Sequence, residues 1–582
     1  MRVLFLHPED SPGVGPWSRE RWNLIVDLGK SSTFSAEAWA QQSGCTILRT
    51  DSFREGLADV RRVREMFSPG RKHLVDEEGI DWWDVTSLLL AQDALTELAL
   101  RRLGDEIKPS AELWASRGGG PVDLLAILLG REIRLFGRGS SARAVAGLTR
   151  YAGLARRFSA AQIKEIGLDK YDSAYRWRSR FGRRRAACAE PVVLVPTAYG
   201  NVSRMAAAYA RLLPRQGFLA VATRESGKKF VPPRNVQVCD LAPYAKAEPP
   251  LTEISDLLQR WDKLRIDLEA LPDLRALSRT SAMDPISHWI RNGLSVRDAW
   301  RTVLENEPIC GVLCGDDSNP YTLLPVLLAA RRRIPTVDFH HGAFDGRYLL
   351  KELPSDVYLA KSEMERDYLV CVCELPGERV VIAAPSSESV HADRGGSADQ
   401  KTSVVFFSEP YEGVGMRAEE VYREVLPPLC RLARQNRRGV ILKLHPFESA
   451  PQRRRMIREI LSPEDSQFVN VVVGPLTEAL MSQAWFGITV ESTTVIDCMQ
   501  YGIQCFLCGW LTLWPFEYTQ QYARFGVGEV LRSAEEVSDI PQRLAEFQSR
   551  AAAGPTRTAD PAQLQRWLTA RSGERAALKP VS

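Results

Sequence analysis

The sequence predicts an α/β protein with two doubly wound, Rossmann-like domains, each built on a parallel sheet. Two observations lead to this fold class. Short apolar runs of strand length alternate with helical patterns, and the alternation comes in two sets, before and after residue 385. Between the sets, the segment 385–400 ("PSSESVHADRGGSADQ") has the polar, Gly- and Ser-rich composition of a linker. We therefore expect an N-terminal domain over 1–385, a linker over 386–402 and a C-terminal domain over 403–560.

The overall composition argues against a nucleic-acid-binding protein and against a membrane-spanning one. The chain has 582 residues, too many for one core, and its 76 basic and 72 acidic residues leave a charge of only +4, which argues against a nucleic-acid partner. No apolar run reaches the roughly 18 residues of a membrane span. The sequence thus predicts a cytoplasmic protein, or one held peripherally at the inner face of a membrane. Several of the eleven cysteines lie in apolar runs, so we expect reduced core residues, including the pair Cys505 and Cys508.

The N-terminal domain opens with the strand-like run "RVLFL", followed by a glycine loop and a helical pattern. His7 comes just after this run, where it would face the cleft that the sheet makes. From about residue 81 to 185 the strand signals vanish, and we predict an all-helical insertion. Its stretch "DKYDSAYRWRSRFGRRR" mixes aromatic residues with arginines, which suits either a membrane surface or a helix with its aromatic side chains packed inward.

Strand–helix alternation resumes at "PVVLVPTAYG" and continues to "VYLAKS". The C-terminal domain then runs from "SVVFFSEP" through "VILKLHP", "VNVVVG" and "FGITVES" to "CFLCGW". Five strands with intervening helices in about 110 residues predict a compact doubly wound domain. Residues 561–582 should form one terminal helix and a tail.

Two strand ends in the C-terminal domain carry polar residues. In "GVILKLHPFES", Lys443 and His445 alternate with Leu444, so they should point from one strand face, and Pro446 should stop the strand. Ligand sites in open α/β sheets lie at the carboxyl edge, where this strand ends.

The second strand end is "GITVESTTVIDCMQYG", with Glu491, Ser492, Thr493 and Thr494 before a helical pattern. Backbone N–H groups at a helix start favour an anion, so this turn and the Lys443–His445 strand end together predict a phosphate pocket. The hydroxyl pair could equally serve only as a helix cap.

Three segments in order, "DFHHGAFDGRYLLK" (338–351), "LKLHP" and "TVESTT", resemble a group of bacterial surface-polymer transferases. This group includes the CDP-glycerol glycerophosphotransferases of teichoic acid synthesis and the capsular polysialyl- and Kdo-transferases. The resemblance covers about 15% of the chain, and the ordered set is more specific than any single motif. It implies the GT-B architecture, in which two doubly wound domains share a cleft.

The resemblance also implies roles for individual residues. His445, Ser492 and Thr493 would bind the donor phosphate, with Lys443 adding positive charge, and His341 would be the general base. "GDDSN" partly matches an acidic motif of related enzymes, which leaves the base open between His341 and two carboxylates, Asp316 and Asp317. The remaining candidates are Pro446, Glu491 and Thr494 on the donor side, and His7, Gly342, Asp345 and Arg347 on the acceptor side.

The function that follows is a metal-independent glycosyltransferase without a cofactor. It would move a sugar or sugar-like group from a nucleotide-activated donor to a hydroxyl of a surface polysaccharide or lipid-linked acceptor, as in bacterial capsule and cell-envelope synthesis. Two alternatives remain from the sequence. One is a sugar-nucleotide epimerase or hydrolase of the same fold. The other is a non-catalytic scaffold that binds a polysaccharide or a partner enzyme.

Overall fold

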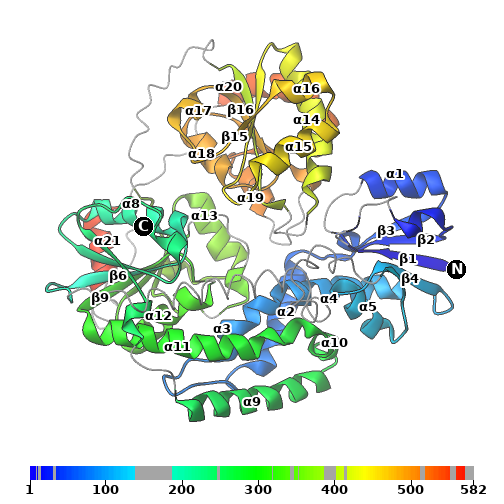
Figure 1. The fold of residues 1–582 in the computed structure, drawn as a ribbon. Helices are drawn as coiled ribbons and strands as arrows, with labels where there is room; N and C mark the ends of the chain where they lie inside the picture. The colour runs from blue at the N-terminus through cyan, green and yellow to red at the C-terminus, as the bar shows by residue number, and fades with distance from the viewer. Residues whose placement is uncertain are drawn as a thin grey trace.

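The computed structural model contains three parallel sheets, joined by helices (Figure 1). It describes residues 1–7, 10, 15–29, 34–137, 187–245, 250–317, 319–340, 347–351, 353–385, 401–411, 416–511, 518–550 and 559–570. We call the sheets first, second and third in chain order. The α/β class with doubly wound parallel sheets is confirmed, and the third sheet in this count is one more than the sequence predicts.

The first sheet has the strand order β3-β2-β1-β4-β5. Its strands are β1 (Arg2–Leu6), β2 (Leu24–Asp27), β3 (Thr46–Arg49), β4 (Glu112–Arg117) and β5 (Arg134–Gly137). The predicted all-helical insertion over 81–185 is therefore wrong in its first part, because it contains β4 and β5. These strands escaped detection because neither is an apolar run: β4 reads "ELWASR", with polar residues at both ends, and β5 is only four residues long.

Helices α4 (Ala91–Asp105) and α5 (Pro121–Leu129) lie in the same region, as the helical periodicity predicts. The rest of the predicted insertion, residues 138–186 with the aromatic and arginine-rich stretch, lies outside the described residues.

A layer of helices connects the first sheet to the second. It includes α2 (Leu57–Phe67), α3 (Trp82–Ser87), α9 (Leu251–Ala270) and α11 (Pro285–Asn306). The rings of Trp83 and Trp261 stack at 6.2 Å between α3 and α9. On α11, the side chain of Arg297 is 1% exposed and forms ion pairs with Asp76 (2.8 Å) and Glu253 (2.5 Å). This layer is thus a core of its own, held by aromatic packing and a buried charge cluster.

The second sheet has the order β12-β11-β10-β9-β6-β7-β8. Its strands are β6 (Val192–Thr197), β7 (Gly217–Ala222), β8 (Val236–Asp240), β9 (Ile309–Cys314), β10 (Thr336–Phe339), β11 (Val357–Ala360) and β12 (Val380–Ile382). The terminal helix α21 (Pro561–Thr569) returns to this sheet, where Leu564, Trp567 and Leu568 join its core (Figure 1). A side chain on Gly311 of β9 would overlap the Leu568 carbonyl, so the helix lies directly on the strand.

The third sheet has the order β15-β14-β13-β16-β17-β18. The five predicted strands are confirmed as β13 (Ser403–Phe407), β14 (Gly439–Lys443), β15 (Val469–Val472), β16 (Ala484–Thr489) and β17 (Cys505–Cys508), and β18 (Glu529–Leu531) adds a sixth. Helices α14 (Ala418–Gln435) and α15 (Ala450–Ile460) also form where helical patterns occur. Strand order reverses direction between β13 and β16, which is the switch point where doubly wound sheets bind ligands.

The second and third sheets share an apolar cluster between them. The rings of Tyr368 and Tyr518 meet at 4.9 Å, and the Gln521 side-chain amide donates to the Asp367 carboxylate at 2.7 Å. Among the described residues, no helix combines the length and the apolar character that a membrane span requires.

Candidate functional site

The carboxyl edge of the third sheet brings the two predicted motifs together. In the strand register, Phe407 of β13 pairs with Lys443 of β14 on one side and with Thr489 of β16 on the other. The loops that follow β14 and β16 therefore start at the same height, one on each side of β13. This arrangement places the Lys443–His445 strand end and the Glu491–Thr494 turn at the switch-point edge.

Lys443 ends β14 with its side chain turned into the protein rather than into bulk water. The residue is 6% exposed, and its ammonium donates to the Leu444 carbonyl at 2.8 Å. Burial lowers the pKa of Lys443, and the charge of Glu448 opposes that effect. A cation desolvated in this way gains most from an anion that arrives at the same edge.

His445 is half-buried and lies in the loop after β14. Its Nδ1 accepts a hydrogen bond from the Phe447 backbone N–H at 3.3 Å, so in the neutral ring the proton belongs on Nε2. Burial lowers the pKa of His445, with a further contribution from the positive charge of Lys443. The residue thus offers an Nε2–H donor and gains a positive charge readily only when an anion is present.

Glu448 holds this loop in place, although the sequence did not single it out. Its carboxylate accepts from the His445 backbone N–H at 2.8 Å, from Arg453 Nε at 2.8 Å and from Ser408 Oγ at 2.9 Å. The side chains of Glu448 and Arg453 are 1% and 3% exposed. One buried carboxylate therefore ties the loop after β14 to helix α15 and to the end of β13. The available signal was the glutamate three residues after His445, a spacing at which a side chain can reach back to a backbone N–H.

Glu409, also missed, performs the same task for the loop after β16. Its carboxylate accepts from the Glu491 backbone N–H at 2.8 Å and from Thr489 Oγ1 at 3.0 Å. Burial raises the pKa of Glu409, and the hydrogen bonds from this turn oppose the rise. The Glu409 carboxylate thus binds a backbone N–H group of the turn that was expected to bind a phosphate.

The three hydroxyl residues that follow Glu491 differ in their hydrogen bonds. Ser492 Oγ accepts from the Thr494 backbone N–H at 3.3 Å, which is a local capping bond. Thr493 precedes helix α18 (Thr494–Gln500) and makes no side-chain capping bond. Thr494 Oγ1 is buried and has no hydrogen-bond partner among the described residues. Ser492 therefore acts as a cap, and Thr494 Oγ1 is a buried hydroxyl that keeps its hydrogen-bonding capacity at this edge.

The acidic candidates of the second sheet lie in the loop after β9. Asp317 is 3% exposed and forms an ion pair with Lys351, whose ammonium lies 4.0 Å from the centre of the Tyr348 ring. Tyr348 in turn donates to the buried Asp338 at 3.0 Å. Burial, with a smaller effect of the Asp317 charge, raises the pKa of Asp338 well above its usual range. Asp317 thus belongs to a buried cluster with Lys351, Tyr348 and Asp338.

Asp316, which precedes Asp317 of this cluster, is half-buried. Neither aspartate caps the following helix α12 (Pro320–Arg331), because Asn319 Oδ1 accepts the Tyr321 N–H at 3.0 Å. His341, Gly342 and Asp345 lie outside the described residues, and Arg347 is placed as the first residue of the short helix η8 (Arg347–Leu349).

His7 directly follows β1 of the first sheet, a separate sheet from the one that contains β10. Its backbone N–H donates to Ser116 Oγ at 2.9 Å. Burial, with Arg117 as the next cause, lowers the pKa of His7 to about 4. Arg417, which precedes α14 of the third-sheet body, approaches the His7 carbonyl at 3.5 Å and Asp27 at 3.4 Å. His7 therefore lies where the first sheet contacts the third-sheet body.

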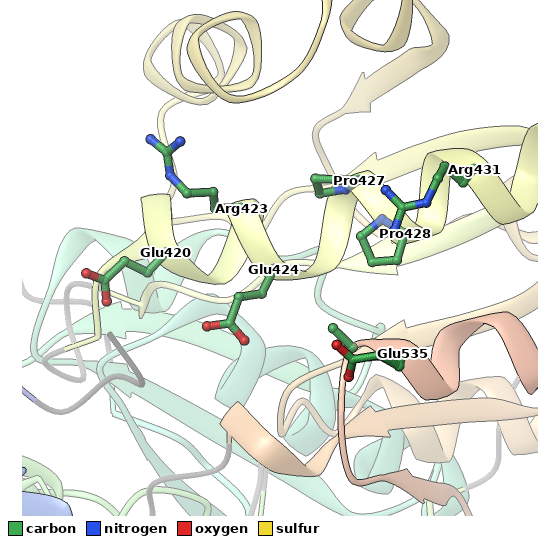
Figure 2. Close-up of a pocket in the computed structure, with 8 residues that line it drawn as sticks. Glu420, Arg423, Glu424, Pro427, Pro428, Arg431 and Glu535 are labelled. Atoms are coloured by element: carbon green, nitrogen blue, oxygen red, sulfur yellow. The ribbon is translucent and has the colours of Figure 1, made fainter. Parts of the chain in front are cut away.

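A pocket of ≈ 280 Å³ lies on α14, away from the predicted site residues. Figure 2 shows its side chains coming from α14 and from the start of the helix η14 (Glu535–Asp539). They include Glu420, Glu424, Pro427, Pro428, Arg431 and Glu535. Glu424 already accepts from Trp510 Nε1 at 2.6 Å. The pocket thus has charges of both signs and shares no residue with the two strand-end motifs.

Within the described part of the chain, no group of three or more His, Cys, Asp or Glu side chains has an arrangement that could hold a metal ion. Cys505 and Cys508 are buried in β17, as expected for strand packing. Burial raises the pKa of Cys508 well above its usual range, which disfavours a thiolate there.

No protein-family model matches the sequence, and no curated protein matches it. The chain is similar to several solved structures. The UDP-GlcNAc 2-epimerase of Neisseria meningitidis, bound to UDP-GlcNAc, is 13% identical, with 62% of this chain and 93% of that chain covered and a TM-score of 0.40. The UDP-GlcNAc 2-epimerase of Methanocaldococcus jannaschii, in complex with UDP-GlcNAc and UDP, is 11% identical, with 65% and 99% covered and a TM-score of 0.38. A glycosyltransferase of Rickettsia africae is 10% identical, with 62% and 89% covered and a TM-score of 0.34.

Proposed function

We propose that the protein is a GT-B-type glycosyltransferase that moves a sugar or sugar-like group from a nucleotide-activated donor to an acceptor hydroxyl. The observation that carries the proposal is the strand register, which brings the ends of β14 and β16, and with them the segments that carry Lys443, His445 and Thr494, to the switch-point edge of the third sheet. Two basic side chains and a buried hydroxyl without a partner suit a diphosphate. In this proposal the third sheet binds the donor, and the second sheet binds a polysaccharide or lipid-linked acceptor.

The chemistry of the transfer assigns work to each side of the cleft. The acceptor oxygen forms a bond to the anomeric carbon of the donor, the bond from that carbon to the phosphate oxygen breaks, and the electron pair leaves with the nucleotide. His445 Nε2–H and the Lys443 ammonium would stabilise the charge that develops on the leaving phosphate. This role needs donors fixed before the reaction, and Glu448 fixes the loop that carries His445.

The acceptor proton passes to a general base. We propose His341 for this role, on the strength of the resemblance, with Asp316 as the other candidate. Asp317 suits the role less well, because its ion pair with Lys351 is buried.

The test is a titration with CMP, CDP and UDP, followed by calorimetry, on the wild type and on His445→Ala. We expect at least one nucleotide to bind the wild type and to bind the variant about tenfold more weakly, as the loss of one charge-assisted hydrogen bond predicts. His288→Ala on α11 is the matched control and should bind like the wild type. Absence of nucleotide binding, or equal binding by His445→Ala, contradicts the proposal. Product formed from a nucleotide sugar without any acceptor would instead indicate an epimerase or hydrolase.

A further inference from the structure

An exposed phenylalanine stands beside the proposed phosphate ligands. Phe447 is 76% exposed, and it is the one aromatic residue among the large apolar side chains that are exposed in the described part of the chain. Water around an aromatic ring is unfavourable, so such exposure calls for an explanation when it occurs at a ligand-binding edge.

Hydrogen bonds of the loop fix the backbone at Phe447. Its backbone N–H donates to His445 Nδ1, and the next residue, Glu448, is anchored by Arg453 and Ser408 in the protein interior. Residues on both sides of Phe447 are thus fixed by hydrogen bonds. The backbone is therefore fixed at a position where the Phe447 ring is exposed.

A second exposed apolar residue lies at the end of the neighbouring strand. Val473 is 58% exposed and follows β15, whose last residue, Val472, pairs with Lys443 in the strand register. The Leu444 backbone N–H donates to the Val472 carbonyl at 2.9 Å, which keeps the two chain segments together beyond the end of β14. Phe447 and Val473 therefore extend from adjacent strand ends. The other exposed large apolar residues, including Val231, Leu251 and Ile266, lie elsewhere in the chain.

The chemistry around the ring narrows what could cover it. The ring centres of Phe447 and His445 are 5.0 Å apart, with the planes inclined by 58°. An occupant of this place must combine a flat apolar face with a phosphate close by, because Lys443 and His445 supply the positive charge. A nucleobase joined through its ribose to a diphosphate meets both requirements, and every nucleobase has a face that can stack on an aromatic ring.

We propose that Phe447, with Val473 beside it, is the platform on which the nucleobase of the donor stacks. This inference rests on the proposed function and adds the base-binding subsite to it. Stacking tolerates different bases, so the platform would contribute affinity for nucleotides as a class rather than selecting one of them.

The experiment is calorimetric titration with UDP, CDP and inorganic pyrophosphate, which lacks a base. We expect Phe447→Ala to raise the Kd for UDP and CDP about tenfold and to leave the Kd for pyrophosphate unchanged. Phe447→Tyr should bind like the wild type, and Phe447→Leu should resemble the alanine variant, because leucine is apolar but cannot stack. Ile266→Ala, which removes an exposed apolar side chain on α9, is the control and should change nothing.

The outcomes separate the two claims. If wild type binds UDP and Phe447→Ala binds it equally well, the platform is overturned while the phosphate site stands. An equal loss of pyrophosphate affinity, or full affinity in Phe447→Leu, also overturns stacking. If the wild type binds pyrophosphate but no nucleotide, the proposed function falls, and the platform falls with it.

Discussion

The half-buried imidazole of His7 should make the first sheet sensitive to mild acid. Burial, with Arg117 and Arg417 adding to it and Asp10 opposing it, lowers the pKa of His7 from 6.5 to about 4 in the folded protein. In the unfolded chain His7 has its ordinary pKa, so between these two values the unfolded state binds a proton that the folded state does not. Stability is therefore lost as the pH falls through this window.

The magnitude follows from the two pKa values. Lowering the pH from about 7.5 to about 5 should cost about 2 kcal/mol through His7 alone, since each pKa unit corresponds to about 1.4 kcal/mol. His7→Gln keeps a polar side chain that does not titrate, so it should lack this part of the pH dependence. Other groups titrate equally in both proteins, and the difference between them isolates His7.

Hydrogen exchange of amides in β1 and β4, corrected for the intrinsic rate at each pH, measures this difference. Wild type should lose about 2 kcal/mol more protection than His7→Gln on going to the lower pH. His288→Gln on α11 should behave as the wild type does. Parallel pH profiles for wild type and His7→Gln would refute the assignment of a lowered pKa to burial.

Three further predictions concern other parts of the molecule. The affinity for a nucleoside diphosphate sugar that binds the protein should decrease as the pH rises from about 5.5 to 8, because its diphosphate does not titrate in this range and a bound phosphate raises the lowered pKa of His445. Calorimetry on His445→Gln should show a flat pH profile. Arg297→Met should lower the free energy of unfolding by about 3–5 kcal/mol, because Asp76 and its acidic neighbours stay buried without a counter-charge. Urea unfolding measures the loss, and a change below about 1 kcal/mol would contradict the prediction. Gly311→Ala should displace α21, because the new methyl group would overlap the Leu568 carbonyl, and limited proteolysis should then cut the terminal helix faster than in the wild type.

The sequence predicted best those elements whose residues are buried on both sides. Strand β13 is buried at all five positions and reads as the apolar run "SVVFF", and β14, β16 and β17 were found in the same way. Strands β4 and β5 were missed because neither is an apolar run: β4 has polar residues at both ends, and β5 has four residues, of which Arg134 and Leu135 are exposed. Their short, mixed sequences resemble helix surfaces when no neighbour is known.

The candidate site was predictable only in part, for a related reason. Lys443 ends an apolar strand, and His445 and Ser492 follow apolar strands, so the sheet topology alone places these segments at one edge. Glu409 acts on the Glu491 N–H, which is 82 positions away in the sequence, and that partner exists only after β13 and β16 have paired. A carboxylate that binds a distant backbone group leaves no local pattern.

The return of α21 to the second sheet has a consequence for how the protein is made. Val193, Leu313 and Val337 of that sheet pack with Leu564 and Leu568 of the last described helix, which the ribosome produces after the whole third-sheet body. During synthesis the part of this apolar face that α21 covers stays open until the helix is made, while the third-sheet body can already fold. The nascent chain therefore passes through a stage that should bind chaperones, and its release into the folded state waits for the final helix.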